Sequence, residues 1–173
     1  VLDTELGLIS ADGTLLTPNR TFEVDVYDPR VLRVLRGFHI EGRFSAFVDT
    51  YIEPNGPSYH ITHHVDVHGE PAAGDHWLEG GFALGLSEDE TPTVECEGLV
   101  GAAKGALGHV RSEGRAGWQM LHTYPKRDGD ETWLPASEAP NIVHGRALHF
   151  YLAAPVQAGQ TTLQATHHAE PAM

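Results

Sequence analysis

Residues 38–67 read FHIEGRFSAFVDTYIEPNGPSYHITHHVDV and carry the clearest secondary-structure pattern in the chain. In the first half apolar residues recur at alternate positions, with Phe47 and Tyr51 as the two exceptions. The apolar positions are Phe38, Ile40, Phe44, Ala46, Val48 and Ile52. A period of two is typical of a β-strand with one face on a core. Residues 54–57 (PNGP) then supply a turn, and the alternation resumes from Tyr59 to Val67, which predicts a β-hairpin.

The two strands of this hairpin can be aligned by matching their apolar positions. Pairing Ile52 with Tyr59 brings Val48 next to His63 and keeps the apolar side chains on one face. The opposite face then carries the polar side chains. Because neighbouring side chains point to opposite faces, a register error of one residue would move the apolar set into solvent.

Other segments carry weaker strand patterns with turn residues between them. They are 22–27, 78–86, 94–100, 118–124, 142–153 and 161–167. Residues 30–36 fit either a helical turn or a short strand. Between residues 98 and 110 four glycines recur at helical spacing, although each would lower the stability of a helix by about 1 kcal/mol, so this conformation stays open. We expect a long surface loop over residues 125–140.

About eight short strands without an internal repeat predict an all-β fold, formed by a single domain over residues 1–173. We expect an antiparallel two-sheet sandwich of jelly-roll type with at most one short helix. A closed β-barrel is the alternative, since both architectures deal with exposed strand edges.

The charge of the chain limits its partners. Aspartate and glutamate outnumber lysine and arginine by 24 to 11, a formal net charge of -13, so phosphate backbones and anionic membranes would be repelled. We therefore expect no nucleic-acid or membrane partner. No apolar run reaches the roughly 18 residues of a membrane span, and residues 1–5 do not resemble a secretion signal. The sequence predicts a soluble protein and leaves its compartment unknown.

Twelve histidines make metal binding the first chemical hypothesis. Strand positions four apart are separated by about 13 Å, whereas positions two apart are about 7 Å apart and their side chains can converge. His64 and Asp66 form such a pair, and a distant His144 or His149 completes the two-histidine, one-carboxylate set that binds iron in jelly-roll oxygenases. The candidate metal ligands are thus His64, Asp66 and His144, with iron or another divalent transition metal as the alternative to no cofactor.

Two further side chains have a possible chemical role. His63 falls on the apolar face, where a hydrogen-bonded core histidine is the simpler interpretation and an acid or base in a ligand cavity the other. Cys96 is the single cysteine, which excludes an internal disulfide and a thiolate zinc cluster. Its neighbours Glu95 and Glu97 are expected to raise its pKa and make a nucleophilic role unfavourable.

The C-terminal pattern runs from Arg146 through Leu148, Phe150 and Leu152, turns near Pro155 and Gly159, and resumes over residues 161–166. This stretch, together with chain length and strand count, resembles the small single-jelly-roll capsid proteins of tailless icosahedral viruses. The resemblance implies a shell subunit of a virion, without catalytic residues and with many identical or related neighbours.

These observations favour a non-enzymatic structural subunit of a larger assembly, partnered by copies of itself or by related subunits. No catalytic residue is assigned. Two alternatives remain: a cupin-like or oxygenase-like metalloenzyme using His64, Asp66 and His144, and a small β-barrel that binds or cyclises an apolar molecule around His63.

Overall fold

The computed structural model describes residues 6–16, 18–24, 30–123 and 147–173, and within these ranges every regular element is a β-strand. The strands form one sheet of eight, one sheet of five and a short two-stranded pair, all antiparallel. Apolar side chains from the two large sheets pack in one common core. The predicted all-β, antiparallel two-sheet sandwich is therefore confirmed, and the alternative of a closed barrel is not what these strands form.

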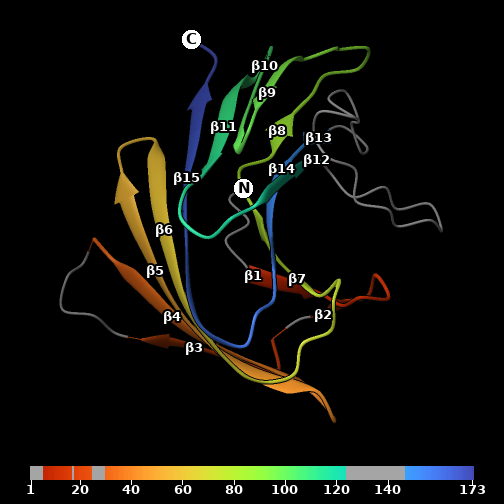
Figure 1. Cartoon of the computed structure of the whole chain (residues 1–173). Helices are drawn as coiled ribbons and strands as arrows, with labels where there is room; N and C mark the ends of the chain where they lie inside the picture. The colour runs from red at the N-terminus through yellow and green to blue at the C-terminus, as the bar shows by residue number, and fades with distance from the viewer. Residues whose placement is uncertain (1–5, 17, 25–29, 124–146) are drawn as a thin grey trace.

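The order of the strands shows which distant parts of the chain become neighbours (Figure 1). Across the eight-stranded sheet they are β3 (Arg20–Val24), β4 (Leu32–Ile40), β5 (Phe44–Asn55), β6 (Ser58–Gly69), β15 (Gly159–Pro171), β11 (Gly108–Gly114), β10 (Val100–Gly105) and β9 (Thr93–Glu97). Across the five-stranded sheet they are β12 (Met120–Thr123), β14 (Phe150–Pro155), β7 (His76–Gly80), β1 (Leu6–Ile9) and β2 (Leu15–Leu16). The short pair is β13 (Ala147–Leu148) with β8 (Leu84–Gly85).

The core lies between the two sheets and follows the alternation of the sequence. In β5, Phe44, Ala46 and Val48 are buried while the residues between them are exposed or half-buried. Across the interface the rings of Phe38 in β4 and Trp77 in β7 form a T-shaped pair, with 5.3 Å between ring centroids. Aromatic pairs in this geometry stabilise a core beyond the area that they bury.

The β5–β6 hairpin forms as predicted, but its register differs by two residues. Ile52 pairs with Ile61, and His63 stands opposite Thr50 instead of Val48. The strands are joined by two residues, and Gly56 adopts a φ of +61°, a value that glycine reaches without strain. A shift of two residues preserves the side-chain alternation, so the predicted inner and outer faces are correct.

The glycine-rich segment is a hairpin and not a helix. Residues 100–105 and 108–114 form β10 and β11, which pair with each other. Gly101 has no side chain because a Cβ there would lie 2.5 Å from the ring of Phe150 across the core. Residues 32–36, left open between helix and strand, lie in β4. The described residues contain no helix, and so none that could cross a membrane. The expected loop at 125–140 and the start of the 142–153 strand fall outside the described residues.

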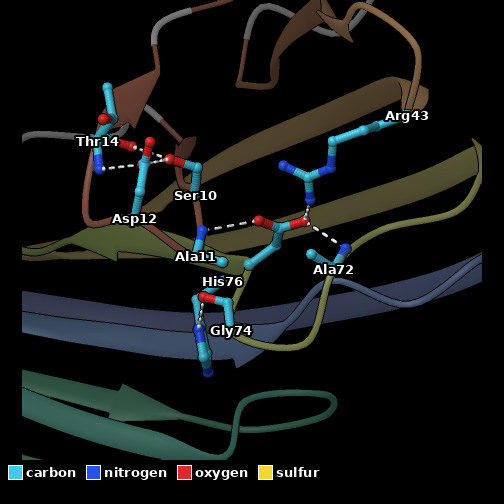
Figure 2. A network of polar contacts seen from close by, with 9 residues as sticks. Ser10, Ala11, Asp12, Thr14, Arg43, Ala72, Gly74 and His76 are labelled. Carbon is cyan, nitrogen blue, oxygen red and sulfur yellow. Dashed lines mark hydrogen bonds and ion pairs between the residues drawn. The ribbon is translucent and has the colours of Figure 1, made fainter.

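Buried Asp75 joins three connections of the chain, through the partners Ala11, Arg43 and Ala72 that Figure 2 labels. The carboxylate of Asp75 accepts hydrogen bonds from the backbone N–H of Ala11, at 2.9 Å, and of Ala72, at 2.7 Å. The guanidinium of Arg43, in the β4–β5 connection, forms an ion pair with the same carboxylate. Asp75 is 1% exposed, so these donors replace the water that its charge would otherwise require.

Asp75→Ala should lower the free energy of unfolding by about 3 kcal/mol or more, because it leaves two backbone donors and Arg43 without their shared acceptor. Urea unfolding measures the change. The control is Asp66→Asn, which alters a more exposed carboxylate that faces His68 at 3.3 Å and should cost less than about 1 kcal/mol. Equal effects of the two variants would contradict this role for Asp75.

Candidate functional site

A glutamate from one sheet bridges two histidines from the other. Glu79 projects from β7, and each of its two carboxylate oxygens contacts one imidazole: Oε2 contacts Nε2 of His63 in β6, and Oε1 contacts Nε2 of His167 in β15. All three side chains are fully buried. An ionised carboxylate only accepts hydrogen bonds, so both Nε2 atoms donate to it.

The outer ring nitrogens of the two histidines are also occupied. Nδ1 of His63 lies 2.7 Å from Oγ1 of Thr50, and Nδ1 of His167 lies 3.0 Å from Oγ of Ser112. Thr50 Oγ1 in turn accepts a hydrogen bond from Nη1 of buried Arg36, at 3.2 Å. A hydroxyl can donate or accept, so the hydrogen bonds of both imidazoles are satisfied whether the rings are neutral or protonated. We call this set the Glu79 network; it comprises Arg36, Thr50, His63, Glu79, Ser112 and His167.

The Glu79 network keeps its central carboxylate ionised. Burial by itself would raise the pKa of Glu79, since a charge is costly in a dry core. Attraction to His63 and hydrogen bonds from His167 and His63 outweigh burial and lower the pKa to about 2. The network therefore acts as a polar clamp between the sheets, and its central side chains His63, Glu79 and His167 have no exposed surface.

His63 is a hydrogen-bonded core residue in this structure, as the simpler of its two interpretations predicts. Its ring has a partner on both nitrogens and packs against the edge of Trp118, with 6.4 Å between ring centroids. Sequence reasoning gave no role to Glu79, Thr50 or Ser112. A lone acidic residue after the apolar pair Trp77 and Leu78 was the available signal for Glu79.

The outer face of the eight-stranded sheet carries a second, exposed group of polar and aromatic side chains. The guanidinium of Arg33 in β4 makes two hydrogen bonds to the carboxylate of Asp49 in β5, at 2.8 and 2.7 Å, and lies 5.2 Å from the centre of the Tyr51 ring. These contacts raise the pKa of Arg33 and lower that of Asp49, chiefly through their shared hydrogen bonds. Such a bidentate pair holds its side chains in one arrangement.

Next to this ion pair the surface has a shallow hollow of about 340 Å³ across β5, β6 and β15. Phe47, half exposed, stands at its side, and polar residues supply most of the lining. The full lining is Phe47, Asp49, His64, Val65, Asp66, Gln160, Thr161 and Thr162. The hollow offers one large apolar contact surrounded by hydrogen-bonding groups, of which Asp49 and Asp66 are acidic.

The predicted metal ligands lie on this outer face, as far as they are described. His64 is exposed opposite Asp49 and Thr162, and its ring forms a T-shaped pair with Tyr51, with 5.8 Å between ring centroids. Asp66 is half-buried and faces His68 at 3.3 Å. His144 lies outside the described residues, so the set of His64, Asp66 and His144 stays a prediction.

Sequence reasoning missed a different group with metal-ligand chemistry. His109, His168 and Glu170 bring one ligand atom each to within 4.8 Å of one another on the outer face of β11 and β15. His168 and Glu170 repeat the pattern of a histidine and a carboxylate two positions apart, which was the available signal. The sequence gives no sign that His109 is their neighbour.

Cys96 lies in edge strand β9 with its side chain half-buried. Burial raises the pKa of its thiol. The predicted rise in the pKa of Cys96 is therefore correct. Its cause is not the adjacent glutamates, because strand alternation turns Glu95 and Glu97 outward to solvent.

Comparisons with known proteins add little to this description. No protein-family model and no curated protein matches the chain. Among solved structures, a crystal structure of heparinase III is similar with a TM-score of 0.49 and 8% sequence identity. The similarity covers 95% of this chain and 23% of the heparinase III chain, and at this level it carries no inference about function.

Removing the Glu79 carboxylate should cost more stability than neutralising it. Glu79→Ala leaves two buried imidazole N–H groups without an acceptor and should lower the free energy of unfolding by about 3–5 kcal/mol. Glu79→Gln keeps one acceptor and should cost about 1–3 kcal/mol. Chemical denaturation measures both. Glu113→Ala, which removes surface ion pairs at 3.4 and 3.9 Å, is the control and should cost less than about 1 kcal/mol.

The Glu79 contribution should also depend on pH. Because its folded pKa of about 2 lies below the ordinary value of 4.5, the contribution is fully present above pH 4.5 and is lost as pH falls towards 2. The stability difference between wild type and Glu79→Gln should therefore shrink over this range, by up to its whole value at neutral pH, about 1–3 kcal/mol. Paired urea titrations between pH 6 and pH 2 test it, and a constant difference would contradict it.

Proposed function

We propose that this chain is a non-enzymatic subunit of a larger protein assembly, and that copies associate through the outer face of the eight-stranded sheet. One observation carries the proposal: Phe47 is 50% exposed on this outer face, beside a hollow lined largely by polar residues. An exposed aromatic anchor with a polar rim is typical of protein contact surfaces. Nothing in the packing of the core requires an aromatic residue at this position.

The charges around Phe47 favour a second copy as the occupant. Arg33 stands beside Asp49, and Asp66 lines the same hollow, so the face carries both signs within a short distance. A patch of this kind can be complementary to itself across a two-fold axis, in which the same residues contact each other reciprocally. The net charge of -13 opposes association, and added salt should weaken this opposition.

The β9 edge of the eight-stranded sheet is less suited to association than the face. The edge strand β9 exposes Thr93, Glu95 and Glu97 in its five residues. Charged residues on an edge strand disfavour pairing with another chain. This arrangement supports contact through the sheet face.

The buried polar side chains bind one another, which supports a structural role for the chain. Glu79, His63 and His167 hold the two sheets together and are occupied by one another. We propose no cofactor for this function. The iron site of His64, Asp66 and His144 stays an alternative prediction, and so does the binding of an apolar molecule, for which His63 would have to give up its present partners.

A virion shell, as implied by the resemblance to capsid proteins, is the more specific form of the proposal. A shell subunit meets several neighbours, so its assemblies have high and discrete masses. A simple two-fold contact yields a dimer. The mass of the assembly therefore distinguishes the two forms.

Native mass spectrometry over a range of protein concentrations tests the proposal. Wild type should form oligomers whose fraction rises with concentration and salt, and Phe47→Ser should weaken their formation at least tenfold. The control is Leu107→Ser, which alters another exposed apolar residue, 60% exposed in the β10–β11 turn. It should leave the oligomers unchanged.

A wild-type protein that stays monomeric at every concentration would overturn the proposal. So would an oligomer that Phe47→Ser leaves intact. A dimer without larger species would retain the contact face and overturn the shell. Far-ultraviolet circular dichroism of both variants checks that the sheets are unchanged.

A further inference from the structure

Three side chains with metal-ligand chemistry meet at the end of the sheet that is distant from Phe47. His109 lies on β11, and His168 and Glu170 lie on the neighbouring strand β15. His109 stands opposite Glu170 in the register of the two strands, and His168 precedes Glu170 by two positions. All three therefore point to the outer face, and one ligand atom from each lies within 4.8 Å of the others.

The spacing within this group suits a small cation. Nε2 of His168 lies 3.3 Å from Oε1 of Glu170. Zinc bonds of about 2.0–2.2 Å place tetrahedral ligand atoms about 3.4 Å apart, so these two atoms already have the spacing of a coordinated pair. The Glu170 side chain is 57% exposed and free to adjust, while the rings of His109 and His168 lie side by side with centroids 6.0 Å apart.

A fourth residue orients one of the ligands. Oγ of Ser58, at the start of β6, lies 2.9 Å from Nδ1 of His168. When Nδ1–H donates to this hydroxyl, the lone pair of Nε2 faces the carboxylate of Glu170. Histidines that bind metal commonly donate their other ring nitrogen to such a partner, which sets the tautomer and the ring orientation. Two electron-rich atoms 3.3 Å apart then need a proton or a cation between them.

We propose that His109, His168 and Glu170 form a binding site for a divalent transition-metal ion, with Zn²⁺ as the ion that best suits two imidazoles and one carboxylate. Three protein ligands leave a fourth position, which is open to water or to a group from another molecule. This site is separate from the predicted ligands His64 and Asp66, which lie on β6.

The surroundings leave this fourth position accessible. A hollow of about 730 Å³ adjoins the site and is lined in part by His109, Glu170 and Lys104. Two basic side chains lie near the site: Lys104 pairs with His109 in register, and Arg111 pairs with His168. Their positive charges oppose the binding of a cation. The guanidinium of Arg111 is engaged by Glu113 at 3.4 Å, and the net charge of -13 attracts cations to the molecule as a whole.

Isothermal titration of the full chain with Zn²⁺, after removal of metal by a chelator, tests the site. Wild type should bind one Zn²⁺ with saturation. His109→Ala and His168→Ala should weaken binding more than about 100-fold, and Ser58→Ala, which only removes the orienting hydroxyl, about 10- to 100-fold. The Co²⁺ form should show the absorption bands of tetrahedral cobalt, and these should be lost in His168→Ala.

His60→Ala is the matched control, because His60 also pairs its Nδ1 with a hydroxyl of a neighbouring strand, Thr166 at 2.9 Å, but lies outside the group. It should leave the affinity unchanged. Equal losses in His60→Ala and His168→Ala would mean diffuse binding to the histidine-rich surface and would overturn the proposal. Loss of binding in His64→Ala alone would assign the metal to β6 and overturn it too. Thermal unfolding in chelator confirms that each variant is folded.

Discussion

The structure depends on one buried charge, the carboxylate of Glu79. Glu79 enters the core from the five-stranded sheet, and its carboxylate is tolerable there only because two imidazoles from the other sheet donate to it. Apolar packing would hold the sheets together in many relative positions, since it has little directionality. The hydrogen bonds of Glu79 require a particular strand of one sheet to face two particular strands of the other, and so select one arrangement.

The network extends this selection across the larger sheet. Thr50 pairs with His63 across β5 and β6, His167 pairs with Ser112 across β15 and β11, and all four side chains face inward. Close packing around the network is consistent with this order: Gly81 lacks a side chain where a Cβ would collide with Ser112 and His167. The same inward orientation leaves the outer face of these strands to polar and aromatic residues, where both candidate contact sites lie.

The two outer sites differ in what they offer. Around Phe47 the aromatic ring and the rigid Arg33–Asp49 pair make a broad surface of mixed charge. Around His168 three ligand atoms converge on a point, with Ser58 orienting one of them. The first geometry suits another protein surface and the second an ion. Because they occupy opposite ends of one sheet, either can function without the other.

The alternation in residues 38–67 determined by itself which side chains of β5 and β6 face the core, because the covalent geometry of a strand turns successive side chains to opposite sides. The predicted register was wrong by two residues, but a shift of two leaves each side chain on the same face, so the prediction that His63 faces the core is correct. It could not resolve the glycines of 98–110, whose spacing matches a helix, because Phe150, the group that needs the space at Gly101, is remote in the sequence. The sequence also showed which residue types could bind a metal. It gave no evidence that His64 and Asp66 lie near a particular distant histidine, so that part of the metal site was assumed. Only the tertiary structure decided that β15 lies between β6 and β11, which brings His167 to Glu79 and His109 to His168. Strand adjacency depends on the packing of the whole core, and no local pattern of residues encodes it.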